Sequence, residues 1–394
     1  MQLISSANLA GKRALVRVDF NVPLDKQFNV TDDRGIREAM PTLRHVLDNG
    51  GSLVLMSHLG RPKEGPEGKY SLRHTVSTIE KLLGVPVIFA GDCIGAEAFE
   101  ASRNLQPGQV LLLENLRFYK QEEKGDDEFA HHLSQHGDVY VNDAFGTAHR
   151  AHASTTIVAK FFKEKYAGFL LNAEIENAQK VLSKAEKPFV AIMGGAKVSD
   201  KIELIDQLMN NVDIIIIGGG MAFTFLRAKG FNIGKSLVEE DKILMAATLL
   251  KKAAGMGVKI LTPLDSIASD KFGEDGRIEV VSNEDFPADM MGLDIGPETA
   301  KFYFETIFNA KTILWNGPMG VFEMDSFARG TFAIADAVVA ATERGAFSLI
   351  GGGDSAAAIA KAGKEDKVSY VSTGGGALLE YMEGKTLPGV AALG

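Results

Sequence analysis

The sequence is poor in the features that mark disulfide-bonded, secreted and membrane proteins. It contains one cysteine, Cys93, so no intramolecular disulfide or thiolate metal cluster can form, and we expect a buried, inert thiol. No apolar run approaches the roughly 18 residues that a membrane-spanning helix requires. The N-terminal segment MQLISSANLAGKR has no basic region followed by an apolar one. Nothing in this segment therefore suggests secretion.

Positive charge is also scarce. The chain has 42 Lys and Arg residues against 51 Asp and Glu, a formal net charge of -9, which disfavours general nucleic-acid binding. An anionic ligand must then be held by local basic clusters. Its 394 residues are too many for one typical hydrophobic core, and 45% are hydrophobic, so we predict a globular protein of two domains.

The familiar nucleotide and metal signatures are missing. The sequence has no G-x-x-x-x-G-K-[ST] loop, no G-x-G-x-x-G fingerprint and no H-R-D loop, and no H-E-x-x-H pattern that would indicate zinc. The missing fingerprint disfavours a nucleotide-dependent oxidoreductase. A two-lobed binding protein without catalysis is a second alternative, disfavoured by the missing secretion signal and by a lysine pair described below.

What the sequence does contain is a repeated unit of a short apolar run, a Gly- or Asn-containing loop and a helical pattern. The runs are RALVRV, SLVLMS, PVIFAG, VLLLEN and DVYVND in the first half, and FVAIMG, DIIIIG, VKILTP, TILWNG, FSLIGG and VSYVST in the second. Continuous apolar runs separated by helices predict parallel strands buried on both faces. We therefore predict an α/β fold of two doubly wound, Rossmann-like parallel-sheet domains. Apolar residues at helical spacing from Leu170 to Leu182 predict a helix that joins them.

Ligands of open α/β sheets bind at the carboxyl ends of the strands. In the first half these ends read RVDFNVP, MSHLGRP, LENLRFY and VNDAFGTAHRAH, each with an arginine. Because arginine binds phosphate and carboxylate oxygens bidentately, they predict a pocket for a small polyanion. His58 by itself is more often a hydrogen-bonded structural residue than a catalyst.

In the second half the strand ends carry glycines instead, in IMGGAKVSDK, IIGGGMAF, GLDIGPET, LWNGPMG, IGGGDSAAA and STGGGALL. Bare amides at the start of a helix bind anions, so these loops predict a nucleotide site. Lys197 and Lys201, four residues apart, are expected on one face of a helix, with both ammonium groups aimed at a phosphate chain. Asp354 could hold a Mg²⁺ ion beside the phosphates, could cap the following helix, or could do both.

Nine segments together resemble the phosphoglycerate kinase family, in order and over essentially the whole chain: VDFNVP, SHLGRP, LLLENLRF, VNDAFGTAHRAHAS, GGAKVSDKI, GLDIGPET, WNGPMGVFE, GGGDSAAA and VSTGGGALLE. The resemblance implies reversible phosphoryl transfer from 1,3-bisphosphoglycerate to ADP in glycolysis, giving 3-phosphoglycerate and ATP. It implies Mg²⁺ as cofactor and a cytosolic monomer whose only partners are these small molecules, with neither nucleic acid nor membrane.

The resemblance also implies four segments: a phosphoglycerate-binding domain over 1–168, a hinge helix over 169–184, a nucleotide-binding domain over 185–380, and a tail over 381–394 that packs back on the first domain. Ligands on separate domains must meet, so we expect hinge-bending that closes over a water-free cleft.

The site residues carried over by the resemblance fall into three groups. The substrate group is Asp19, Phe20, Asn21, Arg34, His58, Leu59, Gly60, Arg61, Arg117 and Arg150. The nucleotide group is Gly194, Gly195, Lys201, Gly219, Gly220, Gly292, Asn316, Pro318, Glu323, Gly352, Gly353, Asp354 and Ser355, with Glu323 on the ribose hydroxyls and Asp354 on the Mg²⁺. The group at the transferring phosphoryl is Lys197, Arg34, Gly374 and Gly375.

One position departs from the family pattern. The family usually has an arginine directly before the isoleucine of this segment, whereas TDDRGIREA has Gly35 there and Arg34 one residue earlier. Either the loop shifts to bring Arg34 into the pocket, or Arg37 or a water substitutes for it.

The chemistry agrees with this reading. The acceptor and donor oxygens, on a carboxylate and a diphosphate, are ionised near pH 7, so no general base is needed. Phosphoryl transfer instead requires positioning and cationic stabilisation.

Overall fold

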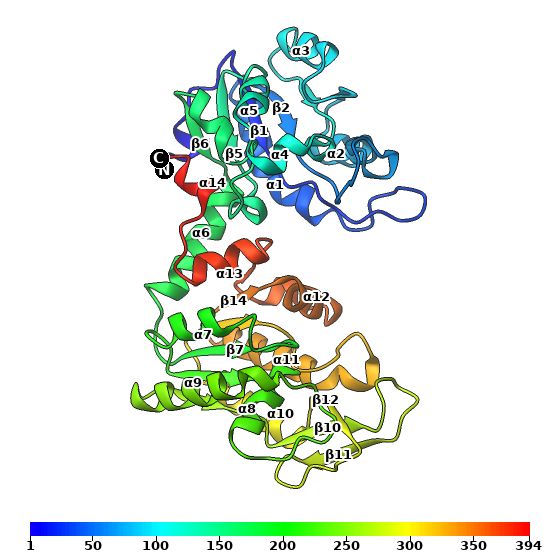
Figure 1. The fold of residues 1–394 in the computed structure, drawn as a ribbon. Coiled ribbons are helices and arrows are strands. Elements are labelled where there is room, and N and C mark those ends of the chain that lie inside the picture. The colour runs from blue at the N-terminus through cyan, green and yellow to red at the C-terminus, as the bar shows by residue number, and fades with distance from the viewer. The chain divides into compact units, whose positions relative to one another are not determined.

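The computed structural model describes residues 1–394 (Figure 1). Its first six strands form one parallel sheet with the order β3-β4-β2-β1-β5-β6. Every residue of β2 is buried, because the sheet is covered on both faces. The strands are β1 (Arg13–Arg17), β2 (Ser52–Met56), β3 (Val87–Phe89), β4 (Val110–Leu112), β5 (Val139–Asn142) and β6 (Lys165–Ala167). The apolar runs predicted all of them except β6, whose three residues include a lysine and form no continuous run.

The longest helix beside this sheet, α1, buries one apolar stripe. In α1, Ile36, Leu43 and Val46 recur at helical spacing and are fully buried against the core. The helices around this sheet are α1 (Arg34–Asp48), α2 (Val76–Leu83), α3 (Ala96–Arg103), α4 (Lys120–Lys124), α5 (Asp127–Ser134) and α14 (Pro388–Ala391). Cys93 is buried, as predicted, and burial raises the pKa of its thiol.

A second six-stranded parallel sheet has the order β15-β14-β13-β7-β8-β9. Its strands are β7 (Phe189–Met193), β8 (Ile214–Ile217), β9 (Lys259–Leu261), β13 (Thr312–Asn316), β14 (Phe347–Gly351) and β15 (Tyr370–Val371). Its helices are α7 (Ile202–Leu208), α8 (Met221–Ala228), α9 (Ile243–Gly255), α10 (Pro297–Phe308), α11 (Arg329–Glu343), α12 (Gly353–Lys361) and α13 (Gly376–Met382). The predicted α/β fold with two parallel sheets is confirmed.

A small antiparallel sheet, in the order β11-β10-β12, is an addition that the sequence did not predict. It consists of β10 (Asp265–Ser269), β11 (Ile278–Ser282) and β12 (Met291–Ile295). Four of the five residues of β11 are exposed, and β12 is interrupted by Gly292 and Asp294, so neither strand has the continuous apolar run of a buried parallel strand.

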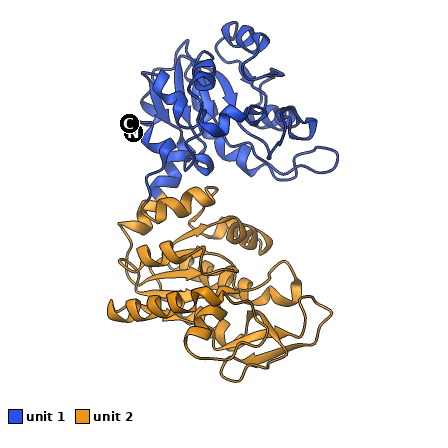
Figure 2. Ribbon diagram, in the orientation of Figure 1, with its two compact units in different colours: residues 1–176, 385–394 blue, residues 177–384 orange.

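The chain divides into two units (Figure 2): unit 1 comprises residues 1–176 and 385–394, and unit 2 comprises residues 177–384. Helix α6 (Phe169–Leu182) runs from unit 1 into unit 2. The expected boundary at residue 380 falls inside α13, and unit 1 resumes at Lys385. The terminal helix α14 is fixed on unit 1 by the Gly389 amide, which donates to the Ala148 carbonyl at 2.8 Å. None of the helices has the length and apolar character needed to cross a bilayer.

Candidate active site

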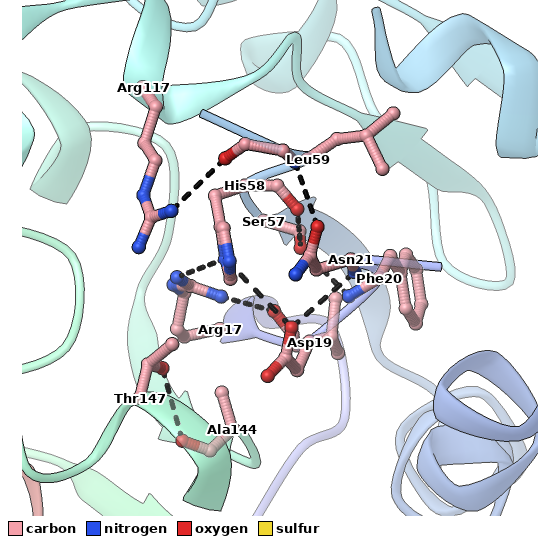
Figure 3. A network of polar contacts seen from close by, with 12 residues as sticks. Arg17, Asp19, Phe20, Asn21, Ser57, His58, Leu59, Arg117, Ala144 and Thr147 are labelled. Atoms are coloured by element: carbon pink, nitrogen blue, oxygen red, sulfur yellow. Dashed lines mark hydrogen bonds and ion pairs between the residues drawn. The ribbon is translucent and has the colours of Figure 1, made fainter. Parts of the chain in front are cut away.

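In unit 1, the loops that follow β1 and β2 are joined to each other at the carboxyl end of the sheet (Figure 3). The Gly60 amide donates to Asn21 Oδ1 at 2.8 Å, and the Phe20 amide donates to Ser57 Oγ at 2.9 Å. Gly60 has a φ of +63°, and a Cβ there would lie 2.4 Å from the Tyr70 ring, so no other residue fits without displacing that ring. The two loops therefore form one rigid surface.

The loop after β4 fixes the same surface from a third strand. Asn115 Nδ2 donates to the Leu59 and Tyr70 carbonyls at 2.7 and 2.9 Å, and Asn115 Oδ1 accepts from the Arg117 amide at 3.0 Å. Arg117 Nη1 donates to the Gly60 carbonyl at 3.1 Å. Because one nitrogen is already bound, the guanidinium is held in place before any ligand arrives.

His58 is buried beneath this surface and is neutral. Its pKa lies well below its usual value because of burial first and the positive charges of Arg17 and Arg117 second. Arg17 Nη2 lies 3.2 Å from His58 Nδ1, and a guanidinium can only donate, so Nδ1 accepts and the ring proton is on Nε2. His58 is thus a neutral hydrogen-bond donor. Its Nδ1 also lies 3.9 Å from Asp19 Oδ1.

Arg17, the arginine of RVDFNVP that was expected to line the polyanion pocket, lies inside the protein instead. Its side chain is fully buried, and its Nε donates to Ser154 Oγ at 2.8 Å. Ser154 in turn donates to the buried Glu122 carboxylate through its hydroxyl, at 2.5 Å, and through its amide, at 3.0 Å. The RVDFNVP motif contains Arg17, but only the fold shows that the strand end turns this arginine inward toward His58.

The other arginines expected in the substrate group lie around this surface. Arg61 and Arg150 are exposed. Burial is the main cause of the lowered pKa values of His58 and His152, and the charges of Arg61 and Arg150, respectively, add to it. Arg34 is the first residue of α1 and is half-buried. Gly35 faces the β1 loop, since a Cβ there would lie 2.9 Å from the Asp19 carbonyl oxygen. Arg37 is exposed and forms an ion pair with Asp33, one turn earlier.

In unit 2, the glycine loops after β7, β8 and β13 pack backbone against backbone. The amides of Gly194, Gly195 and Gly219 donate to the carbonyls of Asn316, Pro318 and Met319 at 2.9, 3.0 and 3.0 Å. A Cβ on Gly194 would lie 2.1 Å from the Pro318 carbonyl oxygen. The expectation that these three amides bind phosphate is therefore wrong, because the protein itself uses them. Glycine is required here by the close approach of the chains.

The expected helix carrying Lys197 and Lys201 is also wrong. Helix α7 begins at Ile202, because Ser199 donates through its amide and hydroxyl to the Glu239 carboxylate, at 3.0 and 2.5 Å, and holds the preceding residues in a turn. Lys197 is exposed in the loop. Lys201 points inward and donates to Asn316 Oδ1. Burial lowers the pKa of Lys201, opposed by the carboxylates of Asp200 and Asp354.

The start of α12, unlike the glycine loops after β7, β8 and β13, offers backbone amides to a ligand. Gly352, with a φ of +89°, is the N-cap, and no side chain caps the helix. Asp354 is the second residue of α12, so its role as a cap is excluded. Ser355 Oγ accepts from the Gly317 amide at 2.5 Å, which fixes this turn on the β13 loop. The amides of the first turn have no partner within a helix and lie at the positive end of its dipole.

After β15 the Gly374 amide donates to Ser372 Oγ at 3.0 Å, so this amide is already engaged, while Gly375 adopts a φ of +47°.

A cavity of about 480 Å³ lies in unit 2 beside α12, with Asp354 and Glu323 on its wall. Four of the expected glycines and Pro318 line it: Gly195, Gly219, Gly220 and Gly292. The rest of the wall is largely apolar and includes Leu237, Phe272, Met291 and Leu293, none of which sequence reasoning selected. Leu293 lies within the GLDIGPET segment, beside Met291 on β12, whereas no motif includes Leu237, Phe272 or Met291. An apolar cavity with few polar groups suits a planar base.

No group of three or more His, Cys, Asp and Glu side chains could hold a metal ion by itself. Mg²⁺ in nucleotide sites needs no such group, since it takes most of its ligands from phosphates and water and one or two from carboxylates. Asp354, at the cavity wall and at the start of α12, fits that requirement.

Comparison with known proteins bears on what these sites do. The family model described as phosphoglycerate kinase matches residues 4–385. A phosphoglycerate kinase of Chlorobium luteolum is 53% identical over 390 residues, covering 99% of this chain and 98% of the relative. The solved phosphoglycerate kinase structure from Coxiella burnetii is 41% identical with a TM-score of 0.89, covering 99% of this chain and 98% of that one. The structure from Pyrococcus horikoshii OT3 is 30% identical with a TM-score of 0.85, covering 100% and 98%. The chain therefore belongs to the phosphoglycerate kinase family, the glycolytic kinases that transfer a phosphoryl group between 1,3-bisphosphoglycerate and ADP.

Proposed function

We propose that this protein transfers the acyl phosphate of 1,3-bisphosphoglycerate to ADP, reversibly, and gives 3-phosphoglycerate and ATP. The family match over residues 4–385 carries the proposal. The chemistry of the two strand-end sites supports it, because unit 1 offers arginines and unit 2 offers an apolar cavity beside a helix N-terminus. By the same family argument we propose a cytoplasmic monomer.

We assign the phosphoglycerate to the strand-end surface of unit 1. Arg61, Arg117 and Arg150 balance the charge of its phosphate and carboxylate, and the half-buried Arg34 adds a fourth cation. Arg117 uses Nη1 on the Gly60 carbonyl, and its buried Nε lies 3.5 Å from Glu123 Oε1, so Nη2 is the nitrogen that meets the ligand, in a fixed orientation.

Three further side chains orient the ligand. His58, held as the Nε2–H tautomer, donates to a ligand oxygen without adding charge. Asn21 uses its Oδ1 on the Gly60 amide and keeps its Nδ2 donors for the ligand. Asp19 accepts from the ligand hydroxyl, while Phe20, Leu59 and Gly60 shape the surface.

We assign the nucleotide to unit 2. Its base enters the apolar cavity, Glu323 accepts from the ribose hydroxyls, and the first-turn amides of α12 with Lys201 bind the phosphates. A Mg²⁺ ion held by Asp354, when bound, neutralises charge on the phosphate chain. Asn316 orients Lys201 by accepting a hydrogen bond from its ammonium at Oδ1 and is itself fixed by donating to the Gly351 carbonyl at 3.0 Å.

The protein's chemical contribution is electrostatic. Lys197 is exposed and its side chain makes no hydrogen bond or ion pair within the protein, so its ammonium is available to the phosphoryl group in transit. We assign the same role to the Gly375 amide. Neither reacting oxygen carries a proton near pH 7, so no side chain has to act as a base.

The test is ATP formation from 1,3-bisphosphoglycerate and MgADP, followed in a coupled assay. We expect turnover that disappears without Mg²⁺ and that falls strongly in Arg117→Ala. A pure, folded protein that forms no ATP above the uncatalysed background would overturn the proposal.

A further inference from the structure

The last residue of α12, Lys361, is joined to the loop that carries Glu323. Its Nζ donates to the Phe322 carbonyl at 2.9 Å, to the Glu323 carbonyl at 3.4 Å and to Asp325 Oδ1 at 3.2 Å. An ammonium group has three hydrogens, so these three acceptors satisfy it fully. The contact lies at the opposite end of α12 from the proposed phosphate site, about 13 Å away along a nine-residue helix.

The Glu323 side chain depends on its main chain for its position. The carboxylate is exposed on the cavity wall and makes no hydrogen bond within the protein. On one side the loop is fixed by the Val321 amide, which donates to the Leu293 carbonyl at 2.8 Å, and by the buried Phe322 ring. On the other side Lys361 holds the carbonyls of Phe322 and of Glu323 itself, which lie on either side of the Glu323 Cα.

We propose that Lys361 is a positioning residue that sets Glu323 for contact with the ribose and ties that contact to the helix that binds the phosphates. The inference rests on the proposed function, in which Glu323 accepts from the ribose hydroxyls. The phosphates and the ribose belong to one ligand, so their binding groups must keep a fixed separation. Helix α12 is a rigid spacer, and Lys361 fastens the ribose loop to its end.

A structural role alone is the competing explanation. A lysine in the last turn of a helix is stabilised by the helix dipole, and its loss lowers stability without any particular effect on a ligand. The two explanations differ in how they depend on the ribose hydroxyls, because a positioning role acts only through groups that Glu323 contacts.

The experiment compares MgADP with Mg-2′,3′-dideoxy-ADP, which lacks those hydroxyls, in Lys361→Met. Methionine retains an unbranched stem and removes the charge and the donors. We expect KM for MgADP to rise about tenfold, the scale of a lost charged hydrogen bond, with kcat within about twofold. KM for the dideoxy nucleotide should change less than about twofold, because the contact that Lys361 sets is already missing.

Lys364→Met is the matched control. Lys364 lies three residues later and forms an ion pair with Asp336 of α11 rather than with the Glu323 loop. Its substitution should leave both KM values unchanged. Lys361→Arg, which retains a charged donor, should restore part of the MgADP affinity. If Lys361→Met does not fold, Asp325→Ala removes one of the three acceptors of Lys361 and should raise KM for MgADP alone, by a smaller factor.

Equal losses for both nucleotides in Lys361→Met or Asp325→Ala would overturn the inference and leave a structural role. Glu323→Gln separates this outcome from a failure of the proposed function. If Glu323→Gln and the removal of the hydroxyls both leave wild-type affinity unchanged, the ribose assignment itself is wrong. If both weaken binding but Lys361→Met does not, only the positioning role fails.

Discussion

Asp143 gives unit 1 a dependence of stability on pH that the structure specifies in sign and size. The residue follows β5 directly and is fully buried. Its Oδ1 accepts from the Leu171 amide of α6 at 3.1 Å, and its Oδ2 has no hydrogen-bond partner. Burial raises the pKa of this carboxyl to about 7, and the neighbouring Thr42 hydroxyl and the amides of Leu171 and Leu170 oppose that rise. The folded protein therefore holds a proton that the unfolded chain releases near pH 3.8.

The sign follows from the folded state having the higher pKa. The protonated carboxyl contributes stability that is fully present below the unfolded pKa and is lost as the pH rises through about 7. At 1.36 kcal/mol per pH unit, the loss between pH 5 and pH 8 amounts to about 2–3 kcal/mol in the free energy of unfolding.

Asp143→Asn should abolish this dependence. The amide keeps an acceptor for the Leu171 amide and cannot titrate, and its cost of burial is the same at every pH. Relative to wild type, the variant should therefore gain about 2–3 kcal/mol of unfolding free energy between pH 5 and pH 8. Urea titrations read by hydrogen exchange in β1 and β5 measure unit 1, while fluorescence of Trp315 reports on unit 2.

Asp138→Asn provides the matched control in the same unit. Asp138 pairs with Arg13 at 3.0 Å, and the hydrogen bonds and charge of Arg13 hold its pKa below the usual value against the effect of burial. Its contribution is lost only as the pH falls toward that lower pKa, so the difference from wild type should be constant between pH 5 and pH 8. A constant difference for Asp143→Asn as well would refute the reasoning, because it would mean that the buried carboxyl does not titrate in this range.

Three further predictions concern the proposed site. Lys197→Ala should lower kcat on the order of 10²-fold, since the cation acts where charge develops, with little change in nucleotide affinity; an unchanged kcat with a raised KM would assign Lys197 to ground-state binding. Asp354→Asn should weaken MgADP binding far more than metal-free ADP binding in calorimetric titrations, and equal small effects would contradict a Mg²⁺ ligand. Arg34→Ala should lower kcat and raise KM for phosphoglycerate, whereas Arg37→Ala, which breaks only an exposed ion pair, should be nearly silent in the same assay. Unchanged kcat and KM in Arg34→Ala would show that Arg34 does not take the role of the family's arginine.

The apolar runs of the sequence predicted the fold because the inner parallel strands are buried on both faces, and continuous burial leaves a continuous run. The edge strands β3, β9 and β15 are partly exposed but still carry such a run. Eleven of the twelve parallel strands carry such a run, and only β6 does not. The three antiparallel strands of unit 2 were not predictable in this way, since β11 exposes Ile278 and Val280 and buries mainly Val281. Where a strand has an exposed face, the sequence pattern no longer distinguishes it from a loop.

The motifs likewise identified the strand ends that form the site, because chain order fixes which residues follow each strand. They did not determine what each group contacts. Either role, phosphate binding or close packing of loops, would explain the glycines at 194, 195 and 219. Only the packing of the three loops shows that the amides of Gly194, Gly195 and Gly219 meet carbonyls and not phosphate. The spacing of Lys197 and Lys201 would align them only on a helix. Ser199 between them is instead bound to Glu239, 40 residues away in the chain, and the helix begins after Lys201.

The contacts of the Arg17 and Lys361 side chains also depend on residues that are far away in the chain. Arg17 reaches Ser154 and Lys361 reaches Phe322 across 137 and 39 residues, distances over which no local pattern of sequence carries information. Local sequence determines backbone conformation and burial, which depend on neighbours in the chain. Hydrogen-bond partners, tautomers and shifted pKa values depend on neighbours in space, and only the tertiary structure supplies those.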